Sequence, residues 1–474
     1  MNMIIPNDVL TILEKLEHNG YEAYVVGGCV RDTLLNKAVH DWDVTTSALP
    51  HEVQTVFKHD ITIETGIQHG TVTVITEGHP VEITTFRIDG TYSDSRRPER
   101  VTFTSSLTQD LARRDFTINA MAYHPAKGLI DPFGGKHDLQ QKTIRCVGNA
   151  RSRFEEDALR ILRALRFSST LNFQIAPDTA NALLEEKEKL CHISAERVRE
   201  ELIKLLCGKN CAQVLRVYGT VLAVWIPEIL PMVGFQQHTP YHAYDVWEHT
   251  IRTVEAIQPI PVLRFTMLLH DIGKPNTFTQ DEQGIGHFYG HGAVSTEIAK
   301  QVLERLKFDR KSKESIITLV KYHDIRCELS PIWIKKQLRK FGTDLFLQLL
   351  EVHKADITGQ NPNLLHRLED IMKCEAMAKE ILSEPPCFSV KDLAVNGSDL
   401  IALGFSQGKI IGTILQFLLD AVIDETCKEK GIAGIFESKQ IFIYKILIHK
   451  HICISQMCLC CMINPFYKGT VFHI

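Results

Sequence analysis

Two glycines, an arginine and two aspartates stand close together near the N-terminus. Residues 27–46 read GGCVRDTLLNKAVHDWDVTT. Gly27 and Gly28 follow a short apolar run, and they let a ligand's phosphates come close to the backbone, where the amides of the next helix attract anionic oxygen. Arg31 can add a charge-assisted contact to a triphosphate. The segment therefore predicts an anion-binding turn.

The two aspartates of this segment are candidate metal ligands. Asp41 and Asp43 are two positions apart on an expected strand, so both side chains should point to one face. Paired carboxylates suit Mg²⁺, which takes substrate phosphates as further ligands. Glu82, within the run VEITTFR, is a candidate third carboxylate, although an outward-facing strand residue is an equally good interpretation. The combination is typical of nucleotidyl transfer.

The elements that position these residues follow from the apolar pattern. Residues 4–18 have helical spacing, and residues 23–26 form a short apolar run that predicts a strand. Alternating β-branched residues predict a strand meander over 60–87, and charges with glycine and proline predict a mobile loop over 89–104. From residue 151 onward the pattern is almost wholly helical. An α/β head of about 145 residues followed by a helical body is expected.

Composition limits the class of protein. The 474 residues are 44% apolar and 23% charged, which excludes a disordered, collagen-like or coiled-coil chain. The net charge of −4 requires no nucleic-acid or membrane partner, so any basic surface must be local. Scattered cysteines and an N-terminus without secretory features predict a cytoplasmic protein. Apolar stretches are too short to predict a membrane span.

The C-terminal residues differ in composition from the rest of the chain. After Glu437 the sequence has no acidic residue, and four of the 13 cysteines fall here. A zinc site using Cys458, Cys460 and Cys461 is one interpretation, but a second paired cysteine cluster is absent. We therefore expect this tail to take no part in the function of the protein.

Five segments extend the similarity of residues 27–46 to one family. They are EITTFRIDGTYSDSRRPERVTF, DLARRDFTINAMAY, DPFGGKHDL, RFEEDALRILRALRF and ISAERVREELIKLL. With them the chain resembles the nucleotidyltransferase superfamily, and specifically the bacterial-type (class II) tRNA nucleotidyltransferases that build and repair the 3′-terminal CCA, over roughly residues 20–425.

The resemblance implies an α+β fold with a polymerase-β-like α/β head, an all-α neck, an HD-like body and a tail. The expected domains are the head at 1–145, the neck at 146–210, the body at 211–358, the tail at 359–426 and an atypical extension at 427–474. It also implies Mg²⁺ as cofactor, and CTP, ATP and the tRNA 3′ end as partners. The sequence indicates no oligomeric state.

The resemblance assigns further roles in nucleotide binding. Arg114 would bind phosphate and Asp115 a ribose hydroxyl. On one continuous helix, the carboxylate of Asp157 and the fork of Arg160 would share a polar side and could serve the Watson–Crick edges of both C and A. Further phosphate contacts are expected from Arg163 and Arg166. Without the resemblance, ion pairs on a solvated helix would be the default interpretation.

A second constellation lies in the helical body. An adjacent histidine and aspartate end the apolar run RFTMLLHD, with another histidine about twenty residues earlier, and the pattern resembles the HD family of metal-dependent phosphohydrolases. The resemblance implies a divalent metal, better a transition metal than Mg²⁺, on four ligands: His249, His270, Asp271 and Asp356. His291 and His323 are additional candidates. Whether such a site hydrolyses phosphate esters is left open.

Other functions remain open at this point. The chain could be a poly(A) polymerase of the same superfamily, or an enzyme that adds only CC or only A. It could also be a non-catalytic RNA-binding protein with an inactive head, or an enzyme whose main activity lies in the HD-like body. The intact acidic and basic residues speak against a non-catalytic protein. The loop sequence DGTYSDSRRP, the HD-like body and the lack of a strongly basic C-terminal extension favour CCA addition over a poly(A) polymerase.

Overall fold

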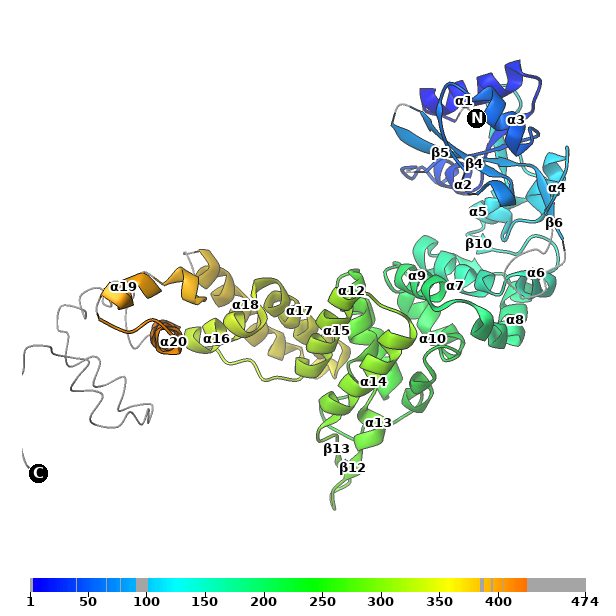
Figure 1. Ribbon diagram of the computed structural model, residues 1–474. Coiled ribbons are helices and arrows are strands. Elements are labelled where there is room, and N and C mark those ends of the chain that lie inside the picture. The colour runs from blue at the N-terminus through cyan, green and yellow to red at the C-terminus, as the bar shows by residue number, and fades with distance from the viewer. Residues whose placement is uncertain are drawn as a thin grey trace, which may run out of the picture. The chain divides into compact units, whose positions relative to one another are not determined.

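The computed structural model describes residues 3–423 except 40, 65, 77, 91–100, 384–387, 394 and 403. The chain forms two compact units (Figure 1). The first unit contains Met1–Lys321 and Thr358–Pro362, and the second contains Tyr322–Ile357 and the described residues from Asn363 onward. None of the described helices is both long and apolar enough to cross a membrane.

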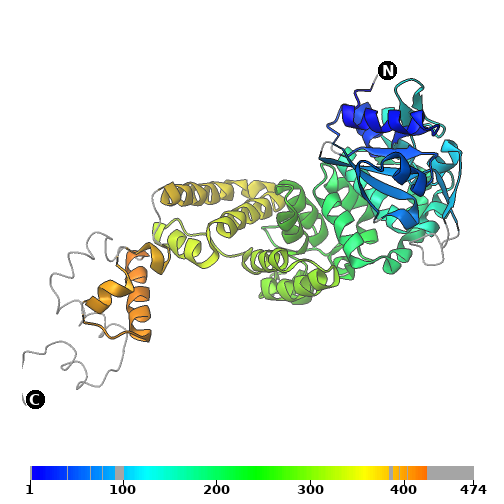
Figure 2. The same ribbon diagram turned by 45° about the horizontal axis from the view of Figure 1, so that its top comes forward.

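The head of the first unit is built on a mixed sheet. Its described elements are α1 (Asn7–His18), β1 (Ala23–Val26), α2 (Gly28–Leu34), β2 (Asp43–Thr46), α3 (Pro50–Val56), β3 (Ile61–Ile63), η1 (Ile67–His69), β4 (Thr71–Thr76), β5 (His79–Thr85), β6 (Arg87–Asp89), β7 (Val101–Phe103), α4 (Leu107–Ala112), η2 (Thr117–Asn119), β8 (Ala122–His124), β9 (Gly128–Ile130) and α5 (Gly135–Gln140). Seven of these strands pair in the order β3-β4-β5-β2-β1-β8-β9, coloured blue to cyan in Figure 2. Within this sheet, among its described strands, only β2 and β5 pair in parallel.

Local sequence explains the first elements. In α1 the apolar residues recur at helical spacing and are buried, and the helix is followed by Gly20 with a φ of +85°, a conformation that favours glycine. All four residues of β1 are buried because the sheet continues on both sides of it. The expected strand over 23–26 is confirmed, and the helix expected over 4–18 is present but begins at Asn7.

Two expectations for the head need correction. β2 begins at Asp43, so Asp41 precedes the strand instead of lying on it. β6 ends at the first residue of the expected loop and β7 lies inside the loop, where the two strands form an antiparallel pair. Residues 91–100, the centre of that loop, lie outside the described residues.

Helices make up most of the remainder of the first unit. The described elements are β10 (Thr143–Ile144), α6 (Ala150–Glu156), α7 (Leu159–Leu171), β11 (Gln174–Ile175), α8 (Pro177–Glu186), η3 (Lys187–His192), α9 (Ala195–Leu206), α10 (Cys211–Leu222), η4 (Pro227–Met232), α11 (Val246–Ala256), α12 (Pro261–Leu269), α13 (Lys274–Thr277), β12 (Thr279–Gln280), β13 (Gly286–His287), α14 (His291–Arg305) and α15 (Arg310–Tyr322). The helix α7 packs along α9, and α11 packs on α10 and α12.

The second unit is helical in its described residues. It contains α16 (Pro331–Phe341), most of α17 (Thr343–Gly359), η5 (Pro362–Arg367) except its first residue, α18 (Leu368–Ser383), η6 (Val390–Asp392), α19 (Gly397–Ala402) and α20 (Lys409–Ile423). One apolar cluster joins α16, α17 and α18, and another joins α19 and α20. The predicted extension at 427–474, with the candidate zinc ligands Cys458, Cys460 and Cys461, lies outside the described residues.

Candidate active site and metal centre

Three carboxylates gather where β2 begins. The parallel pairing of β2 with β5 sets Asp43 directly beside Glu82, and Asp41 lies two residues before Asp43. Burial raises the pKa of Asp43 to about 6; Arg114 opposes this rise, while Glu82 and Asp41 add to it. The carboxylates therefore repel one another, and a divalent cation fits the position because it would relieve that repulsion.

The glycine turn lies against this acidic group. Gly27 has a φ of +83°, and a Cβ added to it would lie 2.9 Å from Nη1 of Arg114 and 4.0 Å from Oδ2 of Asp43. A side chain at position 27 would therefore displace the guanidinium or strain the backbone. The turn leads directly into α2, which begins at Gly28. The expected proximity of the glycines to the acidic residues is present.

Arg113, Arg114 and Asp115, called the RRD segment below, follow α4 and enter the same region. The carboxylate of Asp110 is fully buried and lies 3.6 Å from Nη2 of Arg114. Although burial alone would raise the pKa of Asp115, Arg163 and the amide of Asn119 hold it at about 2. Nε of Arg163 donates to Oδ2 of Asp115 at 2.7 Å. Sequence reasoning missed Asp110 and Asn119, although both lie within the quoted DLARRDFTINAMAY segment.

Three predicted phosphate-binding arginines surround one aromatic ring. The guanidinium carbons of Arg31, Arg163 and Arg166 lie 5.1, 5.5 and 4.1 Å from the centre of the Phe167 ring. Each also has a polar partner: Nη1 of Arg31 donates to Asn119, and Arg163 pairs with Asp115. Arg166 pairs with Glu201 at 3.0 Å. The head and α7 thus supply a shared cationic cluster.

The predicted base-reading residues do not share one continuous helix. The helix α6 ends at Glu156, and Asp157 has extended backbone angles before α7 begins at Leu159. Oδ1 of Asp157 accepts a hydrogen bond from the Leu159 amide, and Oδ2 pairs with Arg197 at 2.9 Å. Aspartate favours such a capping position over a helix interior. The expected geometry is therefore wrong for Asp157, which lies at a helix break.

Arg160 is buried and makes more contacts within the protein than the sequence suggested. It is 8% exposed, and Nη1 pairs with Oε2 of Glu156 at 2.7 Å while Nη2 donates to the Arg113 carbonyl at 3.0 Å. Glu156 was not predicted as a site residue, but its position four residues before Arg160 is the signal that could have found it. The backbone bond to Arg113 joins α7 to the RRD segment.

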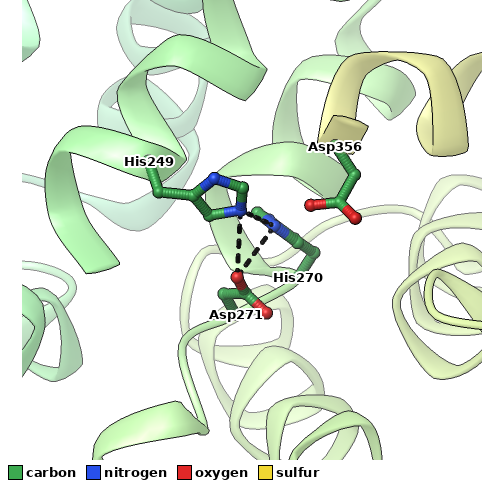
Figure 3. Close-up of side chains that lie close together, drawn as sticks. All are labelled: His249, His270, Asp271 and Asp356. Carbon is green, nitrogen blue, oxygen red and sulfur yellow. Dashed lines mark hydrogen bonds and ion pairs between the residues drawn. The ribbon is translucent and has the colours of Figure 1, made fainter. Parts of the chain in front are cut away.

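In the body, two histidines and an aspartate converge in a buried cluster (Figure 3). Nε2 of His249 lies 3.2 Å from Nε2 of His270, and Oδ2 of Asp271 lies 3.1 and 3.2 Å from these two atoms. Nδ1 of His249 faces the Gly359 carbonyl, and Nδ1 of His270 faces the Met267 carbonyl. Each Nδ1 must therefore carry the hydrogen, and the two Nε2 lone pairs point to a common position.

This arrangement has the donor set of a metal centre. Carbonyl acceptors behind ligating histidines fix the tautomer that presents Nε2 to a metal. Lys274 was not predicted: its Nζ lies 2.7 Å from Oδ2 of Asp271 and donates to Gln237. Despite burial, His270 and Lys274 hold the pKa of Asp271 well below its usual value.

The remaining histidine and aspartate candidates are placed as follows. His291 begins α14, with Nε2 3.4 Å from Oδ1 of Asp271. His323 and Asp356 belong to the second unit, where Asp356 lies on α17.

Three family models match parts of the chain. The poly A polymerase head domain matches residues 23–145, and the model described as a probable RNA and SrmB-binding site of polymerase A matches residues 172–229. The model described as a putative tRNA nucleotidyltransferase domain 2 matches residues 276–433.

Curated relatives cover most of the chain. A CCA-adding enzyme of Leuconostoc mesenteroides is 52% identical over 421 residues, which are 88% of this chain and 92% of that protein. The chain belongs to the CCA-adding enzyme family. A CCA-adding enzyme of Lactobacillus johnsonii is also 52% identical, with 88% of this chain and 92% of that protein covered. Members of the family are nucleotidyltransferases, as the head sequence predicted.

Solved structures of CCA-adding enzymes share the fold. The Bacillus stearothermophilus enzyme in complex with CTP is 31% identical, with a TM-score of 0.69 over 93% of this chain and 100% of that chain. The Thermotoga maritima enzyme complexed with tRNA is 22% identical, with a TM-score of 0.54 over 92% of this chain and 96% of that chain. The predicted α+β class with a polymerase-β-like head is confirmed.

Proposed function

We propose that this chain adds C, C and A to the 3′ end of tRNA, using CTP and ATP, and that the carboxylate group of the head carries the reaction. The observation that supports this most directly is the pairing of Asp43 with Glu82 beside Asp41, against the glycine turn at Gly27. Anionic oxygens hold metal ions in nucleotidyl transfer, and the turn offers the adjacent place for a triphosphate.

Asp41, Asp43 and Glu82 would hold Mg²⁺. When bound, the ion would lower the pKa of the tRNA 3′-hydroxyl and neutralise charge on the leaving pyrophosphate. The hydroxyl oxygen attacks the α-phosphate, its proton is lost, and the bond to pyrophosphate breaks. Arg31 and Arg114 would hold the triphosphate in line with that attack.

Base selection would fall to Asp157 and Arg160. A carboxylate accepts from the exocyclic amine that C and A both carry, and a guanidinium donates to ring nitrogen or carbonyl oxygen. Arg197 holds the carboxylate of Asp157 and Glu156 holds Arg160, so both groups are oriented before a base arrives. Asp115, fixed by Arg163, would accept from a ribose hydroxyl.

The test is incubation of full-length protein with tRNA that lacks the terminal C, C and A. We expect CTP alone to add two residues, CTP with ATP to complete CCA, and no growth beyond it. Long A tracts would favour a poly(A) polymerase, and arrest after CC, or addition of A only to tRNA ending in CC, would favour a partial enzyme. An inactive protein that still binds tRNA would indicate the non-catalytic alternative.

The Nε2 lone pairs of His249 and His270 favour a second function, metal-dependent hydrolysis. We propose that His249, His270 and Asp271 bind a divalent transition metal, with Asp356, the fourth residue labelled in Figure 3, as a further ligand. Asp356 precedes Gly359 by one helical turn of α17, and the Gly359 carbonyl bonds His249. When bound, the metal would supply a hydroxide for hydrolysis of phosphate esters such as 2′,3′-cyclic nucleotides.

The variant Asp271→Asn tests this second function apart from the first. We expect it to lose one equivalent of bound Co²⁺ or Mn²⁺ and any phosphohydrolase activity, while CCA addition continues at the unaltered rate. Metal content equal to that of the unsubstituted protein would remove the metal proposal. Loss of CCA addition together with hydrolysis would contradict the separation of the two sites.

We also propose that the chain works in the cytoplasm. The seven cysteines within the described residues carry free thiols, as expected in a reducing compartment. Fractionation of cells followed by immunoblotting tests this proposal, and recovery from the membrane or external fraction would contradict it.

A further inference from the structure

Asn119 lies between two groups that the proposed function assigns to the nucleotide. It is the last residue of η2 and is 6% exposed. Nη1 of Arg31 donates to Oδ1 of Asn119 at 2.7 Å, and Nδ2 of Asn119 donates to Oδ1 of Asp115 at 3.1 Å. One buried amide therefore joins the expected triphosphate contact, Arg31, to the expected ribose contact, Asp115.

The chemistry of these two partners fixes the orientation of the amide. A guanidinium can only donate hydrogen bonds, and an ionised carboxylate can only accept them. The oxygen of Asn119 must therefore face Arg31, and the nitrogen must face Asp115. Rotation of the amide by half a turn would oppose two donors on one side and two acceptors on the other, which is costly in a buried place.

Both partners are also held from their other sides. Asp32 accepts from Nε and Nη2 of Arg31 at 2.9 and 2.7 Å. Oδ1 of Asp115 accepts from the Phe116 amide at 2.8 Å, and Oδ2 accepts from Arg163. The shared amide thus joins two constellations that come from different segments, α2 and the RRD segment, and it restrains each side chain relative to the other.

The charge of Asp115 also depends on this amide. Although burial alone would raise the pKa of Asp115, Arg163 and Asn119 hold it at about 2. The carboxylate is consequently ionised near neutral pH and can accept from a ribose hydroxyl. Loss of the amide would remove one donor from a buried carboxylate and one acceptor from Arg31.

The backbone around Asn119 is anchored by contacts other than this amide. Thr117, which begins η2, donates through Oγ1 to Asp138 of α5 at 2.7 Å. Two residues after η2, the Met121 carbonyl accepts from the Gly27 amide at 3.1 Å. A substitution that removes the amide should therefore leave η2 in place and change mainly the two side-chain contacts.

We propose that Asn119 is a positioning residue that couples recognition of the triphosphate to recognition of the ribose, so that the head selects ribonucleoside triphosphates over their 2′-deoxy forms. The proposal rests on the functions proposed above for Arg31 and Asp115. The amide holds the carboxylate of Asp115 ready for a ribose hydroxyl while Arg31 binds the phosphates of the same nucleotide. Asn119 acts through these residues, because its polar atoms face them.

The test compares binding of CTP and dCTP to the full-length protein by isothermal titration calorimetry with Mg²⁺ present. The ribose preference is the Kd for dCTP divided by the Kd for CTP. Effects on metal or phosphate binding cancel in this ratio, because the two nucleotides carry the same base and triphosphate. We expect a preference of about tenfold or more in the wild type, and a ratio within about twofold of unity in Asn119→Leu.

The variant Asn119→Asp gives a readout that a merely structural residue would not move. At about pH 8 the new carboxylate offers no donor to Asp115, so the ribose preference should fall as in Asn119→Leu. Two carboxylates in one site repel each other, which raises the affinity of the pair for a proton. At about pH 5 the protonated form can donate to Asp115 and still accept from Arg31, as the amide does.

We therefore expect the ribose preference of Asn119→Asp to recover at least about fivefold between about pH 8 and about pH 5. In the wild type and in Asn119→Leu it should stay constant over this range. The charged groups that meet position 119 are Arg31 and Asp115, with Asp32 and Arg163 behind them. They are the same in all three proteins, so the difference in pH dependence reports the substituted side chain.

Thr117→Val is the matched control on η2. It keeps the shape of the side chain and removes the hydrogen bond to Asp138, whereas the contacts to Arg31 and Asp115 remain. We expect a lower melting temperature and a ribose preference within about twofold of the wild-type value. Equal loss of preference in Thr117→Val and Asn119→Leu would overturn the proposal, because it would indicate a general disturbance of η2.

The proposal is also overturned if Asn119→Leu keeps the wild-type ribose preference, or if the preference of Asn119→Asp is the same at both pH values. Circular dichroism establishes that each variant is folded, and the pH series in Asn119→Asp decides alone if Asn119→Leu does not fold. Failure of the proposed function has a different result: the wild type would bind CTP and still add no nucleotide to tRNA lacking CCA. Equal binding of CTP and dCTP by a wild type that completes CCA would overturn the coupling alone.

Discussion

Proton competition at Asp43 gives a quantitative test of the carboxylate group. Its pKa of about 6 means that protons and a divalent ion compete for the same side chain. About one in eleven Asp43 carboxyls is ionised at pH 5 and nearly all are at pH 8, so the apparent affinity for Mg²⁺ or Mn²⁺ should rise about tenfold, or about 1.4 kcal/mol. The affinity rises with pH because only the ionised carboxylate binds the metal.

Titration of Mn²⁺ at the two pH values, followed by electron paramagnetic resonance, measures this change. The histidine cluster also binds metal on our account, so Asp43→Asn serves as the blank: the body contributes equally to both proteins. The difference between wild type and variant should carry the tenfold change. An affinity within about twofold across this range, or the same change in Asp43→Asn, would refute the argument.

The raised pKa of Asp43 also predicts how stability depends on pH. A carboxylate in a salt bridge stabilises the fold as pH rises, whereas Asp43 should destabilise it. Asp43 keeps a proton in the folded state between its ordinary pKa of 3.8 and about 6, while the unfolded chain has lost it. The stability of the metal-free protein should therefore fall as pH rises through this window, by about 1 to 3 kcal/mol. Asp43→Asn should remove that fall, and added Mg²⁺ should offset it in the wild type.

Three further substitutions test the surroundings of the site. Arg197→Ala frees Asp157, and we expect KM for CTP and ATP to rise about two- to fivefold with relaxed selection against GTP and UTP, measured by steady-state kinetics. Asp115→Asn leaves the half-buried Arg163 without its charge partner and should cost about 1 to 3 kcal/mol in thermal unfolding at neutral pH. Gly27→Ala should lower nucleotide addition at least about tenfold and also lower the melting temperature, because alanine is strained at this positive φ and the new Cβ would meet a guanidinium nitrogen.

Each of these has a control and a contrary outcome. Arg199→Ala changes the same helix without touching Asp157, so equal effects of Arg197→Ala and Arg199→Ala would contradict the orienting role. The pKa of Asp115 is about 2, so its stabilisation should be present above about pH 4 and be lost as pH falls toward 2. A stability difference independent of pH in that range would contradict the pairing. Wild-type activity in Gly27→Ala would remove the argument for close approach.

Sequence was sufficient where chemistry and neighbours are local. The helix α1 and the strand β1 follow from the spacing of apolar residues and from the glycine that follows the helix. His270 and Asp271 are neighbours in the chain, so their proximity needs no tertiary contact. Convergence of Asp43 and Glu82 required the parallel pairing of two strands that lie 39 positions apart, which no local pattern specifies.

The less successful predictions have two physical causes: side chains that compete for backbone hydrogen bonds, and contacts between segments that are distant in the sequence. An interpretation of residues 153–167 as one helix weighs periodicity, but the carboxylate of Asp157 caps the next helix and breaks the pattern. The partners Arg197 and Lys274 come from segments whose approach depends on packing.

The most direct test of the central claim is single-turnover addition of CMP to tRNA lacking CCA by Asp41→Ala and Asp43→Ala, with tRNA affinity measured in parallel. The account predicts that addition falls at least about a hundredfold while the Kd for tRNA stays within about threefold. Addition at the wild-type rate by either variant would contradict it.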